Sequence, residues 1–121
     1  MHNAPRPHDV PRRRRLTDAS TLDRDALVRL TNERGDHHLD HVTSGEDVTL
    51  CGRVISVAFP PNMTWATVCV DDGTGMVEFA VPRDGALDYV GATVEVAGTL
   101  TAQKGKPFLT DAVITRVQAA L

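Results

Sequence analysis

The side chains best suited to bind a metal ion occur in the first part of the chain and then within apolar segments. His37 and His41 are four residues apart, and Cys51 and Cys69 follow them. Imidazole and thiolate groups are ligands of zinc, so these four residues define a candidate metal site. Their spacing matches no closed zinc pattern, and the two cysteines lie in separate strand-like segments. The sequence therefore predicts no metal site; it favours a surface histidine loop and isolated, half-buried cysteines.

Groupings typical of catalysis are not found in the sequence. No Gly-rich phosphate loop is followed by a lysine, and no Ser-His-Asp order comes with a nucleophile turn. His37, His38 and His41 could act as bases, but the pattern places no nucleophile near them. We therefore expect a protein that is not an enzyme and that carries no cofactor.

Cations and a single tryptophan offer another chemistry, the binding of nucleic acid. Basic side chains neutralise phosphates, and exposed aromatic rings stack on bases. The chain has one tryptophan, Trp65, and a run of four arginines near its start: Arg12, Arg13, Arg14 and Arg15. Further cations are spread over the second half: Arg53, Arg83, Lys104, Lys106 and Arg116. These ten residues are the candidate binding residues.

The composition limits the class of protein. The chain has 121 residues, of which 41% are hydrophobic and 24% charged, which is typical of one soluble domain. No apolar run approaches the length of a membrane span, and no secretory signal pattern opens the chain. Two cysteines do not make a disulfide framework. We therefore expect a cytoplasmic protein without a membrane partner.

The elements that position the candidate residues are organised around a Gly-rich segment, Asp71-Asp72-Gly73-Thr74-Gly75. It separates two apolar segments, 65–70 and 76–81, that both alternate with a period of two. Such a pattern predicts a β-hairpin, because Asp-Gly supplies the positive φ angles of a tight turn. The alternation turns Trp65 and Glu78 outward, on the same face of the hairpin.

The chain is predicted to divide into three parts. Residues 1–19 contain three prolines and the arginine run, and should form a flexible basic arm. Residues 20–45 should hold a helix over 20–34, capped by Ser20, and a linker; the apolar stripe of the helix should pack on the following domain. Residues 46–121 read as five strands.

Glycines interrupt the first and fourth of these strands, at Gly52 and Gly98, where we expect bends or bulges. A connector too short for more than a helical turn joins the third strand to the fourth. This layout predicts an all-β fold: a five-stranded OB-fold Greek-key barrel preceded by one N-terminal helix.

Three motifs carry a resemblance to a known family: Val48-x-Leu50-x-Gly52-Arg53-Val54, Asp72-Gly73-Thr74-Gly75, and Gly91-x-x-Val94-x-Val96-x-Gly98. In this order they resemble nucleic-acid-binding OB domains of the anticodon-binding and replication-protein type. With Arg14-Arg15-Leu16-Thr17 and Asp25-Ala26-Leu27 ahead of them, the chain is similar to a group of small actinobacterial OB-fold proteins, labelled nucleic-acid-binding by their fold. That group has an arginine-containing segment after the third strand; here the match is Pro82-Arg83-Asp84-Gly85, so any role of that segment rests on Arg83.

Two functions remain open at this point. The resemblance implies weak binding of single-stranded DNA or RNA through the face of the second and third strands and the basic loops. Residues 48–121, however, hold five basic and seven acidic residues, a balance of −2, and aromatic residues make up only 4% of the chain. The alternative is an OB-fold protein-interaction or regulatory module, a subunit of a larger assembly with a protein partner. For Trp65 itself, the alternative to base stacking is a structural role, in which the indole covers the barrel edge or packs against the N-terminal helix.

Overall fold

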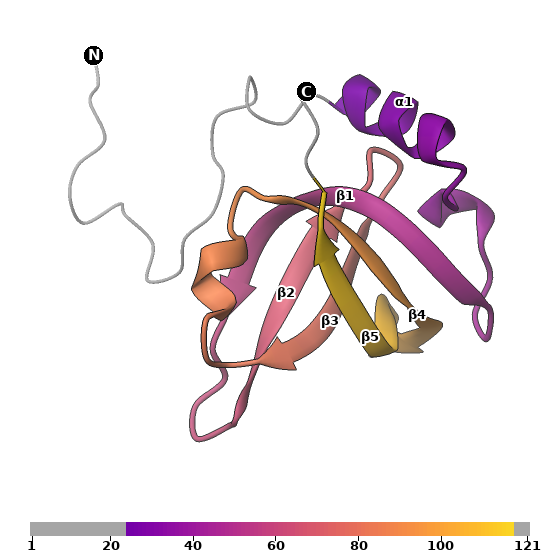
Figure 1. Cartoon of the computed structure of the whole chain (residues 1–121). Coiled ribbons are helices and arrows are strands. Elements are labelled where there is room, and N and C mark those ends of the chain that lie inside the picture. Colours follow the sequence, from indigo (N-terminus) through magenta and orange to yellow (C-terminus); the bar gives the residue numbers. More distant parts are fainter. Residues whose placement is uncertain (1–23, 118–121) are drawn as a thin grey trace, which may run out of the picture.

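The computed structural model describes residues 24–117, which form one α-helix and five strands (Figure 1). Two single turns of 3-10 helix lie between them. In chain order the elements are α1 (Arg24–Arg34), η3 (Leu39–His41), β1 (Asp47–Ala58), β2 (Trp65–Asp71), β3 (Met76–Pro82), η4 (Ala86–Tyr89), β4 (Thr93–Gln103) and β5 (Lys106–Arg116). No helix among these residues is long and apolar enough to cross a membrane.

The strands close into a barrel in the order β1-β2-β3-β5-β4. β1 is long enough to pair with two neighbours: its first half, up to Arg53, pairs with β4, and its second half pairs with β2. β3 and β5 complete the closure as the one parallel pair, with Phe79 opposite Leu109. The predicted five-stranded barrel with one preceding helix is confirmed, and the arrangement is consistent with an OB-like fold.

The barrel interior is filled by the inward-facing residues of the alternating strands. Phe79 is its largest fully buried side chain, surrounded mainly by valines. Leu39 of η3 and Ala86 of η4 join the same cluster from outside the strands, near the start and the end of β3 respectively. Ile114 is only half-buried, because the last part of β5 lies at the margin of the cluster.

The two strand glycines have different roles. Gly98 lies at a bulge, where the pairing of β4 with β5 shifts between Ala97 and Thr99, as expected. The irregularity of β1 is not at Gly52 but at Ile55, between Val54 and Ser56. Gly52 instead permits a close backbone approach, because a Cβ atom there would lie 2.4 Å from the carbonyl oxygen of Asp71.

Helix α1 packs on the outer side of β1 and on the turn between β2 and β3 (Figure 1). Leu27 is 1% exposed, whereas Leu30 is only half-buried. Arg24 pairs with the carboxylate of Asp71. The hydroxyl of Thr31 donates to the carbonyl of Leu27 in the same helix at 3.0 Å and also lies 3.4 Å from the carbonyl oxygen of Cys51. The helix ends before Gly35, which has a φ of 73°. Its predicted cap at Ser20 and the arm 1–19 lie outside the described residues.

Candidate nucleic-acid interface

Trp65, the aromatic residue predicted to bind a base, lies on the outward face of the β2–β3 hairpin. Because strand side chains alternate between faces, the burial of Val68 and Phe79 turns Trp65 and Glu78 outward. Trp65 is 40% exposed, so its ring is available to a ligand. Thr67 lies directly opposite Ala80 on this face, and these two small side chains leave a shallow floor beside the indole.

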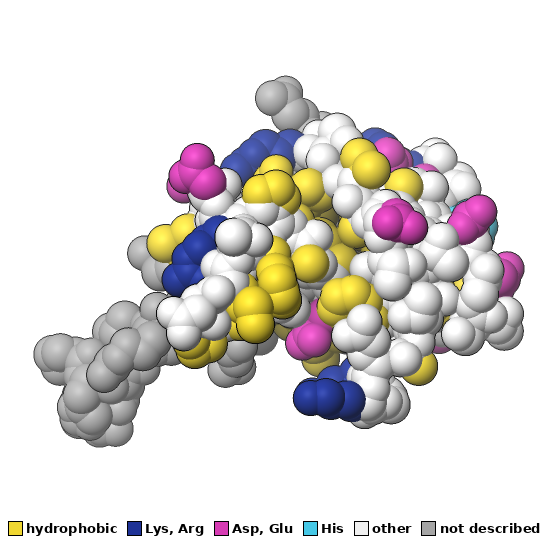
Figure 2. Space-filling view, turned by 90° about the horizontal axis from the view of Figure 1, so that it is seen from below, with side chains coloured by type: hydrophobic (Ala, Val, Ile, Leu, Met, Phe, Trp, Pro, Cys, Tyr) yellow, Lys and Arg dark blue, Asp and Glu magenta, His cyan; other side chains and the backbone are white. Residues whose placement is uncertain are grey.

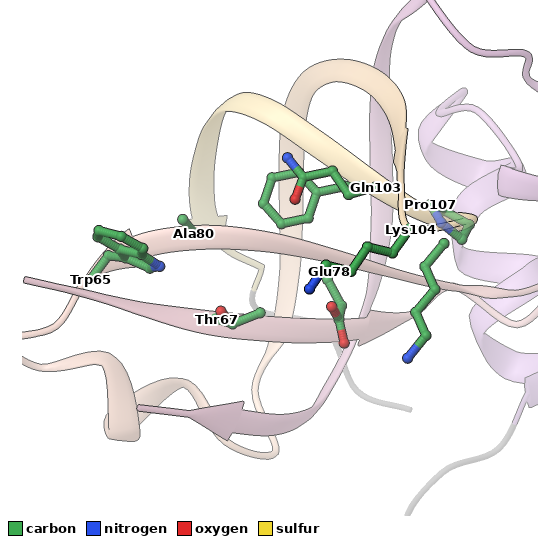
Figure 3. Close-up of a pocket in the computed structure, with 9 residues that line it drawn as sticks. Trp65, Thr67, Glu78, Ala80, Gln103, Lys104 and Pro107 are labelled. Atoms are coloured by element: carbon green, nitrogen blue, oxygen red, sulfur yellow. The ribbon is translucent and has the colours of Figure 1, made fainter. Parts of the chain in front are cut away.

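The turn between β4 and β5 converts this face into a groove of about 490 Å³ (Figure 3). The two strands remain paired out to Gln103 and Lys106. Lys104 and Gly105 have φ angles of 53° and 78°, so they form a tight two-residue turn. Five residues of this hairpin line the groove opposite β2 and β3: Gln103, Lys104, Lys106, Pro107 and Phe108.

The groove has an aromatic end and a charged end. Figure 3 shows Trp65 at one end and Glu78 with Lys104 toward the other, with Thr67 and Ala80 between them. Trp65 is paired with Pro82, four residues along β3 from Glu78. At about 3.3 Å per residue, the two ends are roughly 13 Å apart. Such a length can hold more than one nucleotide of an extended strand.

Arg83 lies beside the aromatic end of the groove. Its guanidinium stacks on the ring of Phe59, 4.9 Å from the centroid, and donates to the carbonyl of Pro60 at 3.1 Å. Its backbone NH donates to the carbonyl of Thr64, next to Trp65. Seen from below, hydrophobic side chains gather over the middle of this end of the barrel, and Lys and Arg side chains lie toward its edges (Figure 2).

Arg53 and Arg116, predicted from the sequence as binding cations, do not line this groove. Arg53 donates from Nε to the hydroxyl of Thr93 at 3.3 Å. Arg116 stacks on Tyr89, 5.0 Å from the ring centroid, and donates to the carbonyl of Asp88 at 2.8 Å. Both are therefore held near the start of β4. Arg12, Arg13, Arg14 and Arg15 lie outside the described residues.

The acidic turn is less unfavourable to an anionic ligand than its sequence indicates. Asp71 and Asp72 are each 1% exposed and are occupied within the protein. Asp71 pairs with Arg24, and Asp72 accepts hydrogen bonds from the backbone NH of Leu39 at 2.7 Å and of Thr74 at 2.8 Å. Without this pair, five acidic residues of segment 48–121 stand against its five basic residues.

His37 and His38 make hydrogen bonds to nearby groups of the protein, and Cys51 is buried. His37 accepts from the backbone NH of Thr49 at 3.1 Å, and His38 contacts the side chain of Asn32 at 2.7 Å. Burial raises the pKa of the Cys51 thiol to about 11, which disfavours the thiolate that a metal would require. Within residues 24–117, no group of three or more His, Cys, Asp or Glu side chains is placed to hold a metal ion.

Phe108 and Gln103 also line the groove, and neither is among the candidate residues predicted from the sequence. Lys104-Gly105 is the sequence feature that indicates this hairpin, because the pair is compatible with a two-residue turn and hence with two long strands that project together. What the pattern could not show is that the parallel pairing of β3 with β5 brings Phe108 next to Glu78.

No protein-family model matches this chain, and the search of curated proteins finds no match either. Function must therefore be inferred from the geometry of the groove.

Proposed function

We propose that this protein binds single-stranded nucleic acid, DNA or RNA, in the groove between the β2–β3 face and the β4–β5 turn. The observation that carries the proposal is the pairing of an exposed indole with two lysines along one groove. Trp65 would stack on a base, while Lys104 and Lys106 neutralise phosphates further along the strand. The volume of the groove, about 490 Å³, is within the range of small-molecule sites.

A single strand fits this geometry better than a duplex. Stacking on Trp65 requires a base whose face is free, and bases within a duplex are already stacked on their neighbours. The shallow floor at Thr67 and Ala80 leaves room for the sugar or the base that follows. Binding should be weak, because Lys104 and Lys106 share the groove with the Glu78 carboxylate and the whole chain carries a net charge of −3.

The test is a titration of the full chain with a fluorescently labelled oligonucleotide, in parallel with the intrinsic tryptophan fluorescence. A stacked base contributes roughly 1–3 kcal/mol by alanine substitution, so Trp65→Ala should weaken binding about tenfold or more. Leu87→Ala is the matched control, because Leu87 is also exposed, to 45%, and does not line the groove. Equal affinity of the Trp65→Ala variant and the wild type would contradict the proposal.

A second candidate, a protein-interaction module, is favoured by the apolar character of the same end of the barrel. Met63 is 43% exposed, two residues before Trp65, and Pro61 and Pro82 are exposed nearby. Contiguous apolar surface is typical of interaction sites. This reading predicts no measurable oligonucleotide binding at low salt with the complete arm present, and loss of a protein partner in the Trp65→Ala variant.

A further inference from the structure

The Glu78 carboxylate is the feature of the groove that general phosphate binding leaves unexplained. It is half-buried and lines the groove together with Lys104 and Lys106. The ion pairs and hydrogen bonds within residues 24–117 do not include it. A negative charge here repels phosphates, so it weakens binding unless it makes a favourable contact with another part of the ligand.

The position of Glu78 separates it from the stacking site. Trp65 lies roughly 13 Å away along the hairpin, too far for one base to contact both side chains. Phe108, in contrast, is the direct neighbour of Glu78 across the β3–β5 pair, and it also lines the groove. The groove therefore has a second position, where a carboxylate lies beside an aromatic ring.

An ionised carboxylate selects bases by their hydrogen-bond donors. It has two acceptor oxygens and no donor, and it can accept two parallel hydrogen bonds. The Watson–Crick edge of guanine presents two adjacent donors, the N1 imino and N2 amino groups. Cytosine and adenine present one amino group beside a ring nitrogen acceptor. Uracil and thymine present one imino group between two carbonyl oxygens, which a carboxylate repels.

We propose that Glu78 reads one base of the bound strand and gives the groove a preference for guanine at that position. The preference rests on the proposed function, since it needs a strand held by Trp65 and the lysines. Trp65 stacks on any base, because every base has a π-face. Glu78 then supplies the discrimination, with the base lying beside Phe108. A good bidentate contact discriminates against a wrong base by about 1–3 kcal/mol, or roughly tenfold to a hundredfold in affinity.

The experiment uses the full chain and a set of short oligouridine strands, about eight nucleotides long, with one central variable base. The central base is guanine, inosine, adenine or uracil. The wild-type protein should bind the guanine strand about tenfold or more tightly than the uracil strand. Inosine lacks the N2 amino group and keeps the N1 imino group, so its strand should fall between the two. This series needs no variant, so it does not depend on the folding of one.

Glu78→Gln then tests the residue itself. The amide offers one acceptor oxygen and one donor group in place of two acceptors, so the preference for guanine should be lost. Removing an acidic group also raises affinity for every strand, and Asp111→Asn controls for this effect. Asp111 is exposed on β5 and does not line the groove, and its φ of 55° is one that asparagine tolerates. The control variant should keep the preference.

The outcomes separate the two proposals. The reading role is supported when the wild type binds the guanine strand more tightly than the inosine and uracil strands. This preference must be lost in Glu78→Gln and kept in Asp111→Asn. Equal binding of all four strands overturns that role and leaves the proposed function in place. No binding of any strand at low salt overturns the proposed function, and the reading role with it. A preference for guanine that survives in Glu78→Gln assigns the discrimination to other groups and also overturns the inference.

Discussion

The two cysteines occupy different environments on the outer side of the barrel wall. Cys51 follows the inward-facing Leu50, so it faces outward from β1, where α1 covers it completely. Cys69 is half-buried on the outward face of β2. Burial raises the pKa of the Cys51 thiol from 9.0 to about 11. The protonated thiol therefore stabilises the fold below about pH 9, and this contribution is lost as the pH rises from about 9 through 11.

Alkylation followed by mass spectrometry should show this difference. At mildly alkaline pH the native protein should react at Cys69 first, while Cys51 should react only through opening of the helix, slower by roughly tenfold or more. In denaturant the two rates should become similar. Equal rates in the native protein would show that α1 does not shield Cys51 in solution.

An added methyl group at Gly52 would clash with the neighbouring strand. A Cβ atom would lie 2.4 Å from the carbonyl oxygen of Asp71 and 2.6 Å from the side chain of Val70, both on the neighbouring strand. Gly52→Ala should lower the free energy of unfolding by about 1–3 kcal/mol or more, measured by urea denaturation. Gly105→Asn is the control, with a φ of 78° and nothing within 4 Å of the added Cβ; its effect should stay within about 1 kcal/mol. Similar losses in both variants would contradict the close approach.

The direction of a side chain, into the barrel or away from it, was predictable where the alternation of a strand determines it. The outward direction of Trp65 and Glu78 followed from the apolar residues between them. The burial of Asp71 and Asp72 was not predictable, because their partners Arg24 and Leu39 come from distant segments of the chain. A buried carboxylate is acceptable only when such partners are present, and the sequence does not show them.

At the scale of elements, helix α1 depends on its contact with β1 and the β2–β3 turn. A helix of 11 residues is marginal alone in water, so its stability must come from packing. Leu27→Ala removes a side chain that is 1% exposed, and should lower the free energy of unfolding by about 2–5 kcal/mol. It should also accelerate alkylation of Cys51.

Leu30→Ala is the matched control, since Leu30 lies on the same helix and is only half-buried. The loss in free energy of unfolding should be clearly smaller for Leu30→Ala than for Leu27→Ala.

Deleting residues 1–35 should lower the melting temperature, whereas deleting residues 1–15 should not. A Leu27→Ala variant as stable as the wild type would show that the helix contributes no packing energy.

Strands and turns were more predictable than their irregularities. The hairpin was evident because Asp-Gly lies between two alternating segments, a local pattern. The bulge of β1 is at Ile55 and not at Gly52, because its place depends on the pairing with β2, which involves residues far along the chain. Gly52 lies where the backbones of β1 and β2 approach each other closely. A glycine within a strand pattern can indicate either such an approach or a bulge, and the sequence alone does not distinguish them.

At the scale of the whole molecule, the groove exists because the barrel closes. Trp65 and Glu78 belong to one hairpin, whereas Lys104 and Phe108 belong to another, and the parallel pairing of β3 with β5 places the two side by side. The sequence indicates each hairpin separately and shows which residues are cations, but it does not show where these cations lie in space. Closure of the barrel places Lys104 along the same groove as Trp65. Arg53 and Arg116 lie near the start of β4 instead.

The basic arm and the groove should contribute to the binding of a strand in different ways. Four arginines at positions 12–15 would contact phosphates without reading bases. Replacing all four with alanine should lower affinity for every sequence and reduce the slope of log affinity against log salt by up to about 3, at roughly 0.7 per contact with a single strand. Trp65→Ala should lower affinity without changing that slope, because stacking displaces no counterion.

The combined variant distinguishes independent from coupled action. Independent action of the arm and Trp65, with no shared contacts, predicts that the two losses in binding free energy add to within about 0.5 kcal/mol. Titrations at two salt concentrations with the wild type, both parent variants and the combined variant measure this directly. A combined loss well below the sum would mean that the arm lies over the groove and shares contacts with Trp65. An unchanged salt slope in the arm variant would show that the arginines do not touch the phosphates, and binding would then depend on the groove alone.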